Sequence, residues 1–272
     1  MRTRSKYKLG FIGAGKLAGS VVRGLVRAKF RSPKEIIASE PNEQARGALR
    51  NEVGISVTTE NAEVAEKADT IFLGVKPGMV LPVLRDIASL INNKVVISLA
   101  AGVRLQSMEA ISTARFMRAL TNTPSAICCA ATAIARGSRT TNEDVDLARK
   151  IFGAIGVVVG VEEKQIDVVT ALAGSGPAFV YTVIEAMAQG GIKMGLPPDV
   201  ALTLATQSVL GAAQLASETK MSPEELRKMV VTPGGTTAAG LAAMEKFKTS
   251  EGLIAAIEAA TKRGQEMAEE NE

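Results

Sequence analysis

The sequence has no histidine and no tryptophan, only two cysteines, and few aromatic residues. Histidine is the usual general acid or base and the commonest metal ligand, so its absence excludes Ser-His and Cys-His catalysis and a histidine-based zinc site. Aromatic residues make up 3% of the 272 residues, which leaves Ala, Val, Leu, Ile and Met to build the interior. The composition therefore favours chemistry that asks little of protein side chains, such as hydride transfer from a bound cofactor.

The two cysteines, Cys128 and Cys129, are adjacent within the apolar run Ile127–Ala135, which we expect to be a strand. This arrangement suits reduced, buried thiols in a cytoplasmic protein better than a disulfide or a metal site. The basic residues up to Lys8 lead directly into a strand-like run, so we expect no signal or transit peptide. The net charge of +4 is small and scattered, and a nucleic-acid partner is not expected.

The stretch Leu9–Ser20 is an apolar run that stops at glycines and passes at once into helix-forming residues. It predicts a strand, a tight turn and a helix. Gly13 permits the sharp turn, Gly15 presents no side chain to a pyrophosphate, and Ala18 lets the helix pack close to the sheet. The turn is typical of a dinucleotide site, although a close helix–strand crossing without a ligand gives the same pattern.

Glu40 follows the second predicted strand, Glu35–Ser39. A carboxylate at this position accepts hydrogen bonds from the adenosine ribose and repels a 2′-phosphate, which favours NADH as the cofactor. Ser39 and Asn42 are also placed to contact a phosphate, so NADPH stays open.

Strand-like and helix-like segments alternate as far as the last predicted strand, Val157–Val161. The alternation predicts an α/β protein whose N-terminal part is a doubly wound sheet of the Rossmann kind. Beyond it the composition changes to Ala, Gly and Met in long helical runs. We therefore expect a dinucleotide-binding domain at residues 1–161 and an all-helical domain at residues 162–272.

Further candidates follow the later strands of the first domain. Lys76 and Ala100–Gly102 come directly after two predicted strands, whose ends face the cofactor crevice in such a fold. Lys76 is placed to meet a phosphate or ribose, with a surface lysine as the alternative. Asn122 is placed to bond a nicotinamide or a substrate, with an Asx turn before Pro124 as the alternative.

Two helical runs of the second domain, Ala178–Met194 and Val200–Ser217, are apolar nearly all round. The second contains residues such as Thr203, Gln207 and Gln214 that are too polar for a span in lipid. A helix this apolar cannot face water in so small a domain, so we expect burial against another subunit. The pattern predicts a homodimer made by interlocked helices, without a membrane partner.

Three later segments are more specific than the glycine turn: Ala173–Phe179 (AGSGPAF), Gly190–Pro197 (GGIKMGLP) and Thr232–Thr237 (TPGGTT). In this order behind the turn, they resemble pyrroline-5-carboxylate reductase over nearly the whole chain. The resemblance implies an NAD(P)H-dependent oxidoreductase that reduces the cyclic imine 1-pyrroline-5-carboxylate to L-proline in the last step of proline biosynthesis. It also implies a helical dimerisation domain, a substrate pocket completed by the partner subunit, and often a ring of dimers.

By positional matching, the resemblance implies roles for individual residues. Thr237 matches a threonine that hydrogen-bonds the ring nitrogen and is the implied catalytic residue, whereas the residues alone predict a capping threonine. The implied substrate-binding residues are Glu163, which alone reads as a solvated acid, together with Gly234, Gly235, Thr236 and Thr237. With the candidates above, the expected cofactor-binding residues are Ile12, Gly13, Ala14, Gly15, Lys16, Leu17, Ser39, Glu40, Asn61, Gly74, Val75, Lys76, Ala100, Ala101, Gly102 and Asn122. No metal site is expected.

Lys228, Met229 and Gln189 depart from the family pattern near the expected pocket. They leave open a reductase of another cyclic imine carboxylate, or a catalytically silent homologue that senses nucleotides. A 3-hydroxy acid reductase is a further alternative, because Lys193 offers a general acid. Pro197 and Pro198 end its helix, however, and leave no amide partner one turn later.

Overall fold

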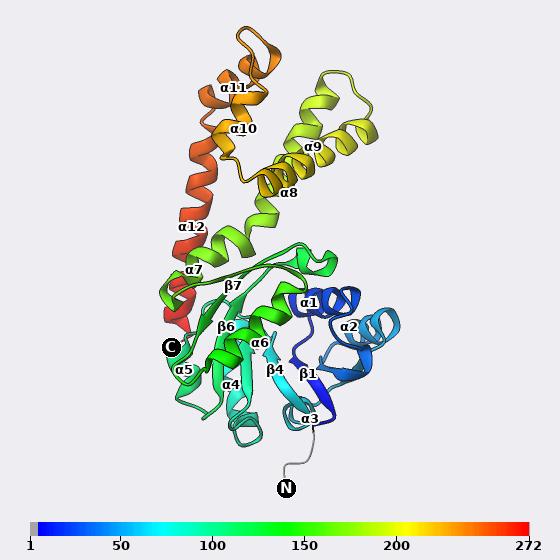
Figure 1. Ribbon diagram of the computed structural model, residues 1–272, viewed down its shortest axis with the longest axis vertical. Helices are drawn as coiled ribbons and strands as arrows, with labels where there is room; N and C mark the ends of the chain where they lie inside the picture. The colour runs from blue at the N-terminus through cyan, green and yellow to red at the C-terminus, as the bar shows by residue number, and fades with distance from the viewer. Residues whose placement is uncertain (1–4, 272) are drawn as a thin grey trace. The chain divides into compact units, whose positions relative to one another are not determined.

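The computed structural model describes residues 5–271 and divides them into two compact units (Figure 1). The first unit comprises the described residues up to Ser175 and the C-terminal segment from Glu258, and the second is Gly176–Ile257. The division expected at residue 161 falls directly after the last strand, which ends at Gly160. The first unit runs on to Ser175 because Ile166 is buried against Leu120 and Ala135.

A sheet of eight strands forms the centre of the first unit among the described residues. The strands are β1 (Tyr7–Ile12), β2 (Ile36–Ser39), β3 (Ser56–Thr58), β4 (Ala68–Leu73), β5 (Val95–Ser98), β6 (Arg115–Leu120), β7 (Ala130–Arg136) and β8 (Gly156–Gly160). Their order is β3-β2-β1-β4-β5-β6-β7-β8, and every pair is parallel except β6 with β7. The chain order reverses between β1 and β4, where a doubly wound sheet opens its ligand crevice. The predicted fold class is confirmed.

Helices connect the strands and cover the sheet. They are α1 (Lys16–Arg27), α2 (Glu43–Ala48), α3 (Asn61–Lys67), α4 (Pro77–Ile87), α5 (Leu105–Glu109), α6 (Asn142–Gly153) and α7 (Ile166–Val169). The last turns of α12 (Thr249–Glu270) also belong to the first unit. The short helix α5 was not predicted from the sequence.

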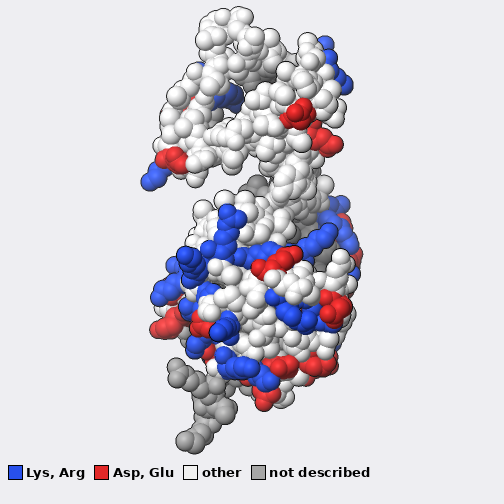
Figure 2. Space-filling model, turned by 90° about the vertical axis from the view of Figure 1, so that its right-hand side faces the viewer, with Lys and Arg blue, Asp and Glu red and all other residues white. Residues whose placement is uncertain are grey.

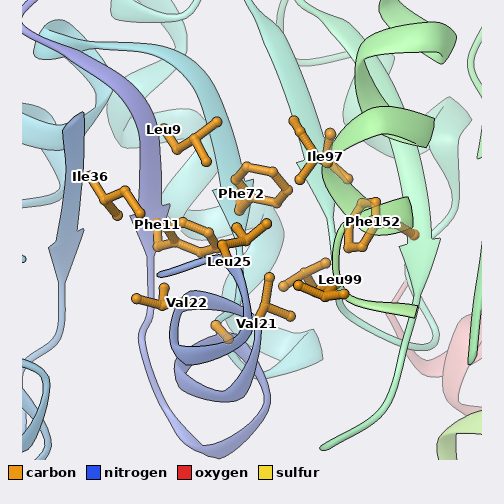
Figure 3. Packing of buried hydrophobic residues seen from close by; sticks show 14 of the residues in the cluster. Leu9, Phe11, Val21, Val22, Leu25, Ile36, Phe72, Ile97, Leu99 and Phe152 are labelled. Carbon is orange, nitrogen blue, oxygen red and sulfur yellow. The ribbon is translucent and has the colours of Figure 1, made fainter. Parts of the chain in front are cut away.

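Three phenylalanine rings pack together where α1 and α6 meet the sheet (Figure 3). The rings of Phe11 and Phe72 stack with centroids 4.5 Å apart, and Phe152 meets Phe72 edge-on at 6.0 Å. Apolar residues of α1, among them Val21 and Leu25, complete this core. The packing fixes the first turn of α1 against the carboxyl end of β1, where the glycine turn lies.

The prediction that both thiols are buried in a strand is wrong. A 3₁₀ turn, Thr123–Ile127, contains Pro124 near its start, and Cys128 follows the turn with a left-handed backbone at φ +62°. The strand β7 therefore begins only at Ala130. Cys128 is half-buried and Cys129 is exposed, and both are free thiols.

The second unit is all-helical, as expected. It contains α8 (Gly176–Lys193), α9 (Pro198–Thr219), α10 (Pro223–Met229), α11 (Thr236–Lys246) and the first turns of α12. Residues 163–193 and Pro198–Thr219 form two helical stretches that are long and apolar enough to cross a membrane by length and composition. In the single chain, large apolar side chains such as Leu202 and Leu210 are more than half exposed. On the face that Figure 2 draws, this unit carries few charged side chains.

Candidate active site

The predicted cofactor residues of the loops after β1 and β4 lie against each other. Gly13 has φ +79°, and its amide donates to the Ser39 carbonyl at 2.9 Å. The Gly74 amide donates to the Ile12 carbonyl at 2.8 Å. A β-carbon on Gly74 would lie 2.6 Å from the β-carbon of Ala18, so only glycine permits this approach of loop and helix. The structure thus brings the ends of β1, β2 and β4 together.

The start of α1 leaves room for a phosphate group beside its first backbone amides. A β-carbon on Gly15 would meet nothing within 4 Å. No side chain caps α1, and its first turn contains no acidic residue. Its first amides and the positive end of the helix dipole therefore face an uncluttered position next to the exposed side chain of Lys16. These features fit a bound dinucleotide.

Glu40 lies beside this turn, as predicted. Its carboxylate accepts hydrogen bonds from the amides of Ala14 and Asn42, both at 3.0 Å. A cavity of about 350 Å³ adjoins it, lined in part by Gly15, Lys16 and Glu40. Glu40 therefore lines a cavity between the glycine turn and α2.

Ser39 and Asn61, also predicted to line the cofactor site, contact each other. The buried Ser39 hydroxyl donates to the Asn61 side-chain carbonyl at 2.7 Å. This bond fixes the first residue of α3 to the end of β2. Lys76, by contrast, is exposed at the start of α4.

The loop Ala100–Gly102 follows β5 at the same edge of the sheet. The amide of Leu99 donates to the Leu73 carbonyl at 2.9 Å, which places the loop next to the end of β4. Gly102 is buried with φ +62°, and a β-carbon there would lie 2.9 Å from that of Met267 in α12. The loop is thus confined between the sheet and the last turns of α12.

Asn122 uses its side chain for backbone bonds within the first unit. Its amide nitrogen donates to the Ala173 carbonyl at 3.0 Å, and its oxygen accepts from the Ala131 amide at 3.2 Å. It does not cap the 3₁₀ turn that follows, so the Asx-turn alternative is wrong. Its predicted contact with the cofactor stays a prediction.

Glu163 is held inside a polar cluster, which corrects the reading of a solvated acid. Its Oε1 accepts the Leu105 amide at 2.6 Å and lies 3.2 Å from Nη1 of Arg118. Arg118 is 2% exposed. Burial lowers the pKa of Arg118, and the charges of Glu163 and Asp167 oppose that shift. Arg118 is not among the residues predicted from the sequence, although an arginine within a largely apolar strand is a signal for a buried charge.

The predicted substrate residues Gly234–Thr237 belong to the second unit. Gly234 has φ +72°, Gly235 is the N-cap of α11, and Thr236 and Thr237 form its exposed first turn. No side chain caps this helix, so the capping-threonine alternative is wrong. The first amides and the Thr237 hydroxyl are presented at one helix end.

The three departures from the family pattern also lie in the second unit. Lys228 pairs with Glu224 at 2.7 Å on the exposed surface of α10, and Met229 is 66% exposed. Gln189 lines a groove of about 590 Å³ between α8 and α9 together with Tyr181 and Leu202.

Comparison with known proteins gives matches over almost the entire chain. A family model described as pyrroline-5-carboxylate reductase dimerisation matches residues 163–267. One described as NADP oxidoreductase, coenzyme F420-dependent, matches residues 8–102. Pyrroline-5-carboxylate reductase of Glycine max is 40% identical over 96% of both chains. The enzyme of that name from Methanosarcina acetivorans is 41% identical over 96% of this chain and 97% of its own.

Solved structures agree with these matches. The pyrroline-5-carboxylate reductase from Coxiella burnetii has a TM-score of 0.87 at 32% identity, covering 98% of this chain and 99% of its own. The pyrroline carboxylate reductase from Plasmodium falciparum, solved with NADP bound, has a TM-score of 0.88 at 26% identity, covering 98% and 100%.

Proposed function

The chain belongs to the pyrroline-5-carboxylate reductase family, and from that premise we propose how its own residues perform the reaction. The protein is an NAD(P)H-dependent oxidoreductase that reduces 1-pyrroline-5-carboxylate to proline. The proposal depends on one observation: a single chain carries both the open glycine turn of α1 and the uncapped start of α11.

The dinucleotide is held by the first unit in this proposal. The amides at the start of α1 bind its pyrophosphate, and Glu40 accepts hydrogen bonds from the adenosine ribose. When bound, the cofactor supplies the hydride. Ala100–Gly102 and Lys76, at the ends of β5 and β4, border the nicotinamide half. The cofactor-binding residues therefore serve mainly to align the cofactor with the substrate, and this alignment is their contribution to the rate.

The substrate needs little acid catalysis. Its protonated C=N bond is already an electrophile, which is consistent with a chain that has no histidine. The amides of Gly235, Thr236 and Thr237 form an anion site at the positive end of α11 and hold the substrate carboxylate. The Thr237 hydroxyl bonds the ring nitrogen and holds the proton there. Thr237 is thus the proposed catalytic residue.

Glu163 is the proposed acid near the substrate. Among the described residues, the hydrogen bonds from the Leu105 amide and from Arg118 both reach its Oε1. Oε2 is therefore the atom that we assign to the substrate side.

The protein is a homo-oligomer, because its second half matches the dimerisation model of the family. We propose that a second copy covers α8 and α9, and that these helices do not enter a membrane. The polar residues Thr203, Thr206 and Gln207 within α9 support a protein partner over lipid. A ring of dimers and a cytoplasmic location are further parts of the proposal, the latter supported by the two free thiols.

The substitution Thr237→Ala tests the proposed site. We expect kcat/KM for the imine to fall about 100-fold, because the hydroxyl that accepts the hydrogen bond of the protonated ring nitrogen and aligns the imine is lost. The Kd for NADPH, measured by fluorescence titration, should stay within about twofold, since the variant leaves the first unit untouched. Thr237→Ser keeps the hydroxyl and serves as the matched control. A variant that keeps full activity, or that loses cofactor binding, would show the role to be misassigned.

A further inference from the structure

Arg118 is a charge buried inside the first unit. It lies on β6, exposes 2% of its surface and is the largest of the fully buried side chains. Its guanidinium stays protonated in a protein, and such a group is rarely buried unless it is paired. Nη1 donates to Glu163 at 3.2 Å, while Nε and Nη2 are buried and have no hydrogen-bond partner within residues 5–271. A buried charge with one ion pair is costly for stability, so stability alone does not explain it.

The partner of Arg118 is tied to the backbone of a neighbouring loop. The oxygen of Glu163 that meets Arg118 also accepts the Leu105 amide at 2.6 Å. Leu105 is the first residue of α5 and follows Gly102 by three residues. The charge of Arg118 therefore fixes the Glu163 carboxylate, which in turn fixes the chain directly after Ala100–Gly102.

The other side of the same loop is held by α12. A β-carbon on Gly102 would lie 2.9 Å from that of Met267, so loop and helix are in close contact. One turn earlier, a β-carbon on Gly264 would lie 3.4 Å from Asp167, whose carboxylate is electrostatically coupled to Arg118. The loop is thus confined between α12 and the cluster of Arg118, Glu163 and Asp167.

We propose that Arg118 is a positioning residue for the nicotinamide half of the cofactor. Through Glu163 and the Leu105 amide, it sets the position of Ala100–Gly102 without touching the cofactor itself. The inference rests on the proposed placement of that loop beside the nicotinamide. If this is so, replacing Arg118 weakens binding of the nicotinamide half of the dinucleotide. Binding of the adenosine half, at the glycine turn, does not change.

Two ligands separate this role from a general structural one. NADPH contains both halves, whereas 2′-phospho-ADP-ribose keeps the adenosine half and lacks the nicotinamide. We expect Arg118→Met to bind the fragment as the wild type does, to bind NADPH about tenfold more weakly, and to lose at least about tenfold in kcat/KM. The control is Arg115→Met. Arg115 lies on the same strand as Arg118 and forms an ion pair with Asp144 of α6, so its loss should leave the ratio of the Kd for NADPH to the Kd for the fragment unchanged.

Arg118→Lys keeps the charge but replaces the planar guanidinium by a single nitrogen. We therefore expect the Kd for NADPH to rise about threefold and the Kd for 2′-phospho-ADP-ribose to stay unchanged. This variant decides the question if Arg118→Met does not fold. Equal weakening of both ligands, or no weakening of NADPH, would overturn the proposal. If the wild-type protein does not reduce the imine, the proposed function is contradicted. The role of Arg118 is still tested in that case, because the Kd values for NADPH and for the fragment do not depend on turnover.

Discussion

At the scale of single residues, Glu40 combines an observed contact with the backbone and a proposed contact with the cofactor. Its carboxylate accepts two backbone amides, from Ala14 in the glycine turn and from Asn42 before α2. These bonds hold a negative charge at the cavity where the adenosine ribose is proposed to bind. A 2′-phosphate entering that cavity meets the charge, whereas a ribose hydroxyl donates to it.

Replacing Glu40 by serine should raise NADPH use relative to NADH by about tenfold, which corresponds to about 1.4 kcal/mol. The reason is that the variant removes the repulsion of the 2′-phosphate. Steady-state kcat/KM with each cofactor gives the ratio. Glu43→Ser, which removes an exposed acid on α2, is the control. An unchanged ratio in Glu40→Ser would refute the ribose role of Glu40.

The glycine turn and the acid beside it were predicted from the sequence, whereas the contact between Arg118 and Glu163 was not. Gly13 and Gly15 belong to one short motif, and Glu40 follows at the end of the next strand, where the motif places an acidic residue. The pair of Arg118 and Glu163 spans 45 positions and exists only because β6 and the segment after β8 fold together. No local pattern predicts such a contact.

At the scale of elements, the start of α6 joins a helix cap to an ion pair. Thr141 and Asp144 cap the helix reciprocally, and Asp144 also accepts two hydrogen bonds from Arg115 at 2.6 and 3.0 Å. Burial by itself would raise the pKa of Asp144. The hydrogen bonds and charge of Arg115, with those from Thr141, outweigh burial and hold the pKa below its usual value.

The lowered pKa of Asp144 predicts a pH-dependent contribution to stability. A depressed folded-state pKa stabilises the protein above the unfolded value of about 3.9, and this contribution is lost as pH falls through the folded pKa. We expect Asp144→Asn to cost about 2 kcal/mol at pH 7 and progressively less below about pH 4. Urea unfolding across this range measures the difference, with the exposed Asp146→Asn as control. A difference that does not depend on pH would be inconsistent with the account.

Most elements were predictable because buried parallel strands form continuous apolar runs. The element predictions were wrong in two places: where a proline turn interrupts an apolar run, and where a helix is too short to give a sequence pattern. The 3₁₀ turn at Pro124 moved the start of β7 and exposed Cys129, and α5 has only five residues. Short helices of this kind depend on tertiary contacts, here the bond from Leu105 to Glu163.

At the scale of the whole molecule, the second unit is incomplete as a single chain. Among the residues that the structure describes, α8 and α9 bury only small side chains, those of Ala188, Ala201 and Ala205. Their large apolar residues are exposed, and the family dimerisation model covers this region. Composition alone predicted a helical second part that needs a partner, but the contacts between two copies are not encoded in any local pattern.

The substitution Leu210→Glu tests whether α9 is an interface. Leu210 is 55% exposed in the single chain, and a charge there should break the oligomer if a second copy covers it. We expect light scattering at micromolar concentration to give an oligomer for the wild type and a smaller species for the variant. Lys246→Glu, at an exposed position of α11, should leave the mass unchanged. A wild type that is monomeric would rule out the homodimer.

The most direct test of the central claim is the initial rate of NADPH oxidation, and separately of NADH oxidation, with 1-pyrroline-5-carboxylate at matched concentrations and neutral pH. We expect turnover, and the ratio of the two rates reports on the charge of Glu40. No turnover with either cofactor, while both still bind, would contradict it and would indicate another cyclic imine as substrate or a nucleotide sensor.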